Sequence, residues 1–175
     1  MSPEERPWAE RFKPRTLSDV VDNKEALRRF VSWVNSRRAG PPKNRSLFIY
    51  GPSGVGKTST VEALAKDFGF DLIEVNASDY RTAKRLETIL GKAVSQTQTL
   101  FGMRRMILFD ELEGISGQED RGGIEAILRL IKETRSPIVL VATGSLEEWE
   151  ELLSPLMKVS EVIEFRRIPF RDIVQ

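Results

Sequence analysis

The sequence has 175 residues, of which 40% are hydrophobic and 30% charged, and its formal net charge is +1. This length and composition suit one globular domain with its own core. The chain contains neither cysteine nor histidine, which excludes disulfides, thiolate metal sites and histidine-based proton transfer. Any hydrolytic chemistry must therefore use carboxylates, Lys or Arg, and a recruited metal. No apolar run approaches the roughly 18 residues of a membrane span, and the charged N-terminal residues lack the apolar region of a signal peptide, so we expect a cytoplasmic protein.

Helical and strand patterns alternate along the chain. Helices are expected over residues 24–38, 58–68, 82–93 and 123–134. Strands are expected over residues 46–50, 72–76, 106–109, 138–142 and 162–165. Asp22 or Asn23 can cap the first helix. Several of the strands are almost uniformly apolar, as in parallel strands covered on both faces. The order predicts an α/β fold with a doubly wound, five-stranded parallel sheet, whose ligands bind at the carboxyl ends of the strands.

Residues 51–58 read GPSGVGKT and match the P-loop pattern, directly after an expected strand and at the start of an expected helix. The glycines permit a tight loop whose backbone N–H groups converge on phosphate oxygens. Lys57 is expected to reach the β- and γ-phosphates of ATP, and the Thr58 hydroxyl to bind Mg²⁺. The alternative is a glycine-rich strand-to-helix turn without a ligand. The candidate phosphate-binding residues are Gly51, Pro52, Ser53, Gly54, Val55, Gly56, Lys57 and Thr58.

Two carboxylates and a threonine follow the third and fourth expected strands. Asp110 and Glu111 come directly after an apolar strand, so they are expected to face the same crevice as the P-loop. Asp110 would hold Mg²⁺ through its water shell, and Glu111 would orient and polarise the attacking water. The alternative is an acidic surface turn, since Glu113 is close by. The Thr143 hydroxyl could bond the γ-phosphate or the water, or it could satisfy a backbone group at the strand end.

Several motifs, in the expected order, resemble those of clamp-loader AAA+ subunits. They are WAERFKPRTLSDVV at 8–21, NASDYR at 76–81 and LFDELEGISGQEDRGG at 108–123. The last motif, with its DRGG, is similar to the large-subunit family of archaeal-type replication factor C. The resemblance runs from Trp8 to about Asp172. It implies an ATP-binding and ATP-hydrolysing subunit that, with replication factor C small subunits, loads the sliding clamp (PCNA) onto primer–template DNA.

The resemblance also implies roles for individual positions. Residues 1–21 would wrap the adenine, and residues 22–175 would form the AAA+ α/β domain, with the family's helical lid and collar absent from this chain. Thr143 falls at the sensor position, where many large subunits have Asn. The residues expected around the adenine are Arg11, Phe12, Pro14, Val20 and Val21.

Contacts with macromolecules follow from the same resemblance. DNA contacts would come from Arg81, Thr82, Lys84 and Arg85, and clamp contacts from Leu100, Phe101 and Met103. From the residues alone, the basic group is more typical of a solvated helix face, and the apolar group could equally be part of the domain's own core. The segment 158–160 lacks the arginine that family small subunits offer to a neighbour's ATP. The ATPase is therefore expected to be weak alone and to depend on a neighbouring subunit's Arg finger.

Three other functions are compatible with a P-loop. One is a different DNA-acting AAA+ ATPase, such as a RarA-like or branch-migration motor, against which the NASD and DRGG motifs argue. Another is a nucleotide-binding scaffold with little hydrolysis, against which Glu111 argues. The last is a small-molecule kinase, which would need an acceptor-binding lid that the sequence does not reveal.

Overall fold

The computed structural model describes residues 13–21, 23–39, 45–76, 104–115 and 121–167. Their elements, in chain order, are η2 (Leu17–Asp19), α2 (Lys24–Ala39), β1 (Ser46–Gly51), α3 (Lys57–Asp67), β2 (Phe70–Asn76), β3 (Arg104–Asp110), η4 (Leu112–Gly114), α5 (Arg121–Glu133), β4 (Ile138–Thr143), α6 (Leu146–Lys158) and β5 (Ser160–Glu164). None of the helices in these ranges has the length and apolar content of a membrane span.

The five strands form one parallel sheet in the order β2-β3-β4-β1-β5. Every strand expected from the sequence is present, and each differs from its expected bounds by two residues or fewer at either end. The predicted α/β fold is therefore confirmed. β4 lies between β3 and β1, so Asp110, Thr143 and Gly51 end three adjacent strands at the same edge. That edge is where a doubly wound sheet binds its ligands.

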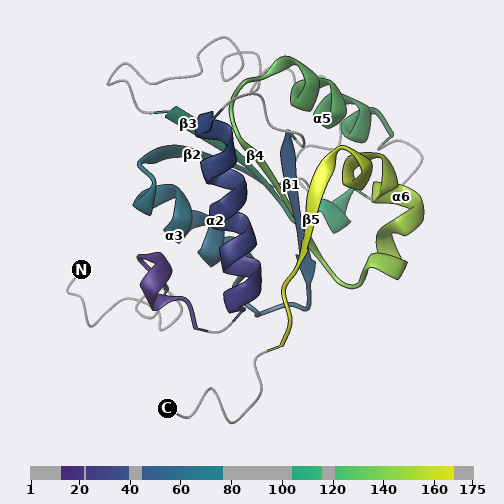
Figure 1. The fold of residues 1–175 in the computed structure, drawn as a ribbon. Helices are drawn as coiled ribbons and strands as arrows, with labels where there is room; N and C mark the ends of the chain where they lie inside the picture. Colours follow the sequence, from purple (N-terminus) through teal and green to yellow (C-terminus); the bar gives the residue numbers. More distant parts are fainter. Residues whose placement is uncertain (1–12, 22, 40–44, 77–103, 116–120, 168–175) are drawn as a thin grey trace, which may run out of the picture.

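Helices cover both faces of the sheet and enclose two apolar cores (Figure 1). Side chains alternate along each strand, so β1 sends Leu47 and Ile49 to the face covered by α2 and α3, and Phe48 to the other. We call these the α2–α3 face and the α5–α6 face. The same alternation directs Asp110, which follows Leu108 by two positions, toward the α2–α3 face.

The helix α6 is absent from the sequence-based expectations. Its apolar residues Trp149, Leu153 and Leu156 pack in the α5–α6 core, at the spacing of a helix face. Its start carries a capping sequence, since the Glu148 carboxylate accepts a hydrogen bond from the Ser145 N–H at 3.2 Å. Pro155 lies inside the helix and weakens the helical pattern, because proline removes one backbone donor. Tertiary packing outweighs that cost here.

The prediction that the Asn23 side chain caps α2 is wrong. Asn23 has a left-handed φ of 52°. Its side-chain amide forms hydrogen bonds with both the carbonyl and the N–H of Arg166. Its Nδ2 donates to the Arg166 carbonyl at 3.1 Å, and its Oδ1 accepts from the Arg166 N–H at 2.9 Å. The side chain thus fixes the segment after β5 against the start of α2 instead of capping the helix. The alternative cap, Asp22, lies outside the described residues.

Candidate functional site

The loop between β1 and α3 occupies the carboxyl edge of the sheet. Gly56 precedes α3 with a φ of 86°, a left-handed conformation that residues with a Cβ rarely adopt. Gly51 at the end of β1 has a φ of 148°, and a Cβ there would lie 2.1 Å from the Phe165 carbonyl oxygen. These two positions therefore require glycine for the loop to turn directly from the strand into the helix. The loop places the N-terminus of α3 at the sheet edge, as phosphate binding requires.

Lys57 is folded back into its own loop. Its side chain is 6% exposed, and Nζ donates to the carbonyl oxygens of Gly51 at 2.8 Å and Pro52 at 2.7 Å. Burial lowers the pKa of Lys57, while the negative charges of Glu113 and Asp110 oppose that change. The buried ammonium group therefore has two neutral carbonyl oxygens as partners. A phosphate anion would form a stronger, charge-assisted hydrogen bond with it.

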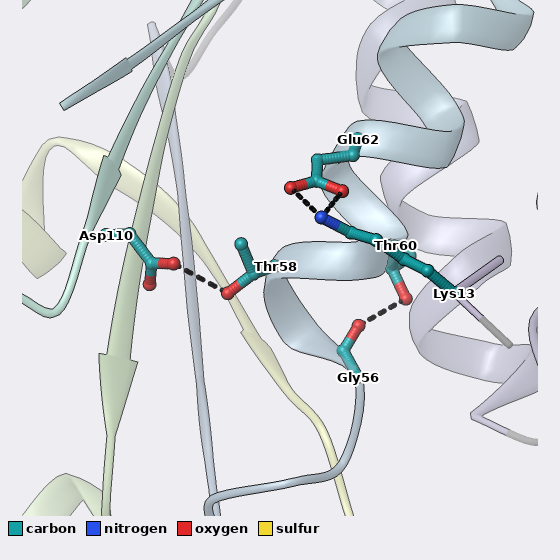
Figure 2. Close-up of polar contacts among 6 residues, drawn as sticks. All are labelled: Lys13, Gly56, Thr58, Thr60, Glu62 and Asp110. Atoms are coloured by element: carbon teal, nitrogen blue, oxygen red, sulfur yellow. Dashed lines mark hydrogen bonds and ion pairs between the residues drawn. The ribbon is translucent and has the colours of Figure 1, made fainter. Parts of the chain in front are cut away.

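Thr58 and Asp110 come from different elements and meet directly (Figure 2). The Thr58 hydroxyl donates to Asp110 Oδ2 at 2.7 Å, and the other carboxylate oxygen accepts from the Glu111 N–H at 2.8 Å. Mg²⁺ takes oxygen ligands and usually keeps several of its waters. A hydroxyl that can bind the ion directly, beside a carboxylate that can bind it through a water, therefore fits Mg²⁺.

Glu111 stands at the turn after β3. Its backbone is left-handed with a φ of 53°, its residue is exposed, and Oε2 accepts a hydrogen bond from Asn76 Nδ2 at 2.7 Å. Asn76 ends β2 and is the register partner of Asp110. A positive φ at a non-glycine residue costs energy, and here it occurs at a residue that lines the nucleotide cleft described below. Sequence reasoning assigned Asn76 no part in the site, although its place at a strand end was a usable signal.

A cleft of about 410 Å³ joins these groups. Its lining is Ser53, Gly54, Gly56, Lys57, Thr58, Ser59, Asp110, Glu111, Glu113 and Thr143. The structure thus brings the central P-loop residues, both strand-end carboxylates and Thr143 to one place. Glu113 and Ser59 also line the cleft, and sequence reasoning gave them no role in it.

Of the residues expected around the adenine, the three that the structure describes do not line this cleft. Pro14, Val20 and Val21 precede α2, and the segment that carries them lies against α3. Lys13 bonds Glu62 of α3, at 2.7 Å to Oε1 and 2.5 Å to Oε2 (Figure 2). Four residues on, the Leu17 N–H donates to Asp67 Oδ2 at 2.7 Å. Two polar contacts therefore hold the segment on the helix that begins at the P-loop.

Several expected site residues lie outside the described part of the chain, together with the helix expected over 82–93. They are Arg11 and Phe12 of the adenine group, Arg81, Thr82, Lys84 and Arg85 of the DNA group, and Leu100, Phe101 and Met103 of the clamp group.

Comparison with known families agrees with the site. Residues 47–167 match the model of the ATPase family associated with various cellular activities (AAA). The match covers well over half of the chain and contains every residue of the cleft lining. The chain belongs to the AAA family of ATPases.

Within that family the similarity is to replication factor C large subunits. The chain is 44% identical over 169 residues to that subunit of Thermofilum pendens, 51% over 135 residues to that of Methanosarcina acetivorans, and 43% over 169 residues to that of Aeropyrum pernix. These alignments cover 97%, 77% and 96% of the chain, but only 40%, 22% and 34% of the relatives' own length. The chain therefore corresponds to a minor part of these relatives, and the large-subunit resemblance expected from its motifs is confirmed.

Proposed function

We propose that this chain is the ATP-binding and ATP-hydrolysing part of a replication clamp loader's large subunit. The observation that carries the proposal is the 2.7 Å contact between Thr58 and Asp110 beside Lys57, which joins the P-loop to the strand-end carboxylates in one cleft. The similarity to replication factor C large subunits supports the clamp-loader assignment over other DNA-acting AAA+ ATPases.

The loop binds the triphosphate of ATP through backbone N–H groups at the start of α3. Lys57 exchanges its two loop carbonyls for phosphate oxygens, and the phosphate anion opposes the lowering of its pKa by burial. Thr58 and Asp110 would hold Mg²⁺, Thr58 directly and Asp110 through a water. When bound, the ion would offset negative charge on the phosphates.

Glu111 orients the attacking water and accepts its proton. Its exposed carboxylate stands at the cleft, and Asn76 fixes one of its two oxygens, leaving the other for the water. Thr143 donates its hydroxyl to the γ-phosphate or to the same water from the neighbouring strand end. Completion of the site by an arginine from an adjoining subunit would raise the rate by orders of magnitude. Hydrolysis by this chain alone is therefore slow.

The adenine lies against the segment that precedes α2. Val21 supports this placement, because it is 60% exposed and is the single large hydrophobic side chain exposed in the described part of the chain. The segment that carries Val21 also lies against α3, the helix that begins at the P-loop. Phe12 and Arg11, which precede Val21 in the sequence, are assigned the same contact.

Partner binding follows from the clamp-loader assignment. ATP held in the cleft strengthens assembly with small subunits, and the assembled complex binds the sliding clamp and primer–template DNA. ATP can favour assembly only if it binds the assembled complex more tightly than it binds the free subunit. Leu100, Phe101 and Met103 contact the clamp, and Arg81, Thr82, Lys84 and Arg85 contact DNA phosphates in a salt-sensitive, sequence-independent way.

The experiment is a pull-down of small subunits and clamp by this chain, with and without Mg²⁺–ATP, combined with single-turnover ATP hydrolysis. We expect ATP-dependent capture and faster hydrolysis in the presence of small subunits. Hydrolysis without capture would indicate a different AAA+ ATPase, and capture without hydrolysis would indicate a nucleotide-binding scaffold. Failure of both would refute the proposal.

A further inference from the structure

The peptide units at the end of β4 are held from two sides. The Thr143 N–H donates to Glu113 Oε2 at 2.9 Å, and the Thr143 carbonyl accepts from the indole Nε1 of Trp149 at 2.8 Å. Glu113 belongs to η4 and Trp149 to the start of α6. The element η4, 30 positions earlier in the sequence, and the helix α6, which follows β4 directly, therefore fix the backbone of one residue in the nucleotide cleft.

Both partners are themselves rigidly placed. Glu113 stands between two core anchors, Leu112 and Ile115, which are 0% and 1% exposed. Trp149 packs its ring against the α5–α6 core. Neither partner can follow a movement of the strand end without disturbing that core, so Thr143 has one favoured backbone position.

Gly144 adds a third restraint. Its N–H donates to the Gly51 carbonyl at 3.1 Å, which is the same carbonyl that Lys57 Nζ contacts. Its φ is 121°, and an added Cβ would lie 2.1 Å from Glu148 Oε2 and 2.7 Å from Trp149 Nε1. The strand end is thus fastened to the first residue of the P-loop, so the distance between Thr143 and the phosphate site is set by backbone contacts.

The hydroxyl is the group of Thr143 that these contacts leave available. Thr143 lines the cleft and is half-buried, and within the described part of the chain no hydrogen bond involves its hydroxyl. A threonine hydroxyl sits one bond from Cβ, so its position is governed by the backbone more closely than that of a longer side chain. Its usefulness to a reacting group therefore depends on how firmly the peptide is held.

We propose that Glu113 and Trp149 are positioning residues that hold the Thr143 hydroxyl toward the γ-phosphate or its attacking water. This inference rests on the proposed function and assigns a role to two residues that do not touch the phosphates in it. Glu113 also places its charge near Lys57, whose pKa it raises against the effect of burial. Trp149 has no charge, so its substitution isolates the positioning effect.

The first test is a double-mutant cycle between Trp149 and Thr143. Trp149→Phe keeps an aromatic ring in the core and removes the indole donor. Single-turnover ATP hydrolysis is measured with replication factor C small subunits present, for the wild type, both single variants and the double variant. We expect Trp149→Phe to slow hydrolysis about 3- to 10-fold, the usual effect of one lost hydrogen bond, with ATP affinity unchanged. On the Thr143→Ala background it should have no further effect, because the hydroxyl is already gone.

The second test approaches the peptide from the other side. Glu113→Ala removes the acceptor, whereas Glu113→Gln keeps an acceptor oxygen and removes the charge. We expect Glu113→Ala to slow hydrolysis more than Glu113→Gln, and the difference between them to vanish on the Thr143→Ala background. This arm retains the test if Trp149→Phe does not fold. Trp33→Phe, in the core of the α2–α3 face, is the matched loss of an indole and should leave hydrolysis per folded molecule unchanged.

The outcomes separate the two proposals. A wild-type chain that never hydrolyses ATP refutes the proposed function. A wild-type chain that hydrolyses ATP, with Trp149→Phe at the wild-type rate or with equal slowing on both backgrounds, leaves the proposed function standing and overturns the positioning role.

Discussion

The two faces of the sheet contribute different parts of the site. The α2–α3 face supplies α3, whose first residues Lys57 and Thr58 stand at the phosphate position, and the core below holds that helix through Val61 and Leu64. The α5–α6 face anchors the turn after β3 through Leu112 and Ile115, and this turn carries Glu111 and Glu113. Binding groups are thus fixed to one core, and the groups proposed to act on water are fixed to the other.

Because of this separation, we expect that ATP binding and ATP hydrolysis can be altered independently by substitution. Within the described part of the chain the two sets meet at the strand ends, where Asp110 contacts Thr58 and where Gly144 contacts Gly51. Substitutions on the α3 side should therefore change affinity for ATP, and substitutions in the turn after β3 should change turnover. Substitutions at the junction should change stability as well.

The largest effect is expected for Glu111→Gln. Glutamine keeps the hydrogen bond with Asn76 possible but cannot accept a proton, so turnover should fall about 10²- to 10⁴-fold with ATP affinity nearly unchanged. Single-turnover hydrolysis and calorimetric titration with ATP measure the two quantities. Glu125→Gln, an exposed carboxylate on α5, is the matched control. Undiminished turnover would remove Glu111 from the mechanism.

Lys57→Ala should produce the opposite pattern. Loss of a charged donor to phosphate should weaken ATP binding about 10- to 150-fold and abolish ATP-dependent assembly with small subunits. Titration calorimetry provides the measurement, and Lys66→Ala, exposed near the end of the same helix, provides the control. If ATP affinity did not change, the two faces would not divide the work as described.

Gly144→Ala probes the junction. The added Cβ would lie too close to side-chain atoms of Glu148 and Trp149, and the φ of 121° is unfavourable for alanine. The free energy of unfolding should therefore fall by about 1–3 kcal/mol. For a chain of this size that corresponds to roughly 2–4 °C in Tm per kcal/mol. Gly69→Ala has a left-handed φ of 68° but no atom within 4 Å of the new Cβ, so its loss should be smaller. If both variants lost the same stability, the backbone conformation of Gly144, and not the crowding at Trp149, would account for the loss.

The smallest effect is expected at Glu74 of β2, whose charge should change stability with pH. Burial, with the nearby charges of Glu62 and Asp110, raises the pKa of Glu74 above its usual value of 4.5. The folded chain then holds more protons than the unfolded chain between 4.5 and the raised pKa, so Glu74 lowers stability as pH rises through that window. Glu74→Gln should therefore raise Tm slightly at pH 7, and the gain should disappear below about pH 4.5. A gain independent of pH would contradict this cause.

Much of the site was predictable from local sequence. A P-loop between a strand and a helix, followed by two carboxylates after another strand, is a pattern whose spatial consequence is fixed by parallel-sheet geometry. Lys57, Thr58, Asp110, Glu111 and Thr143 were identified this way, and all five line the cleft. Trp149 and α6 were not, because Pro155 interrupts the pattern of a helix that tertiary packing nevertheless stabilises.

The sequence by itself determined the parallel sheet, the loop at its edge and the membership in the AAA family. Tertiary structure decided which side chains restrain the reacting groups: Asn76 reaches Glu111 across 35 positions of sequence, and Glu113 reaches Thr143 across 30. Apolar periodicity is a local property that one segment displays by itself. A hydrogen bond between two strand ends depends on strand order and register, which exist only after the sheet has formed.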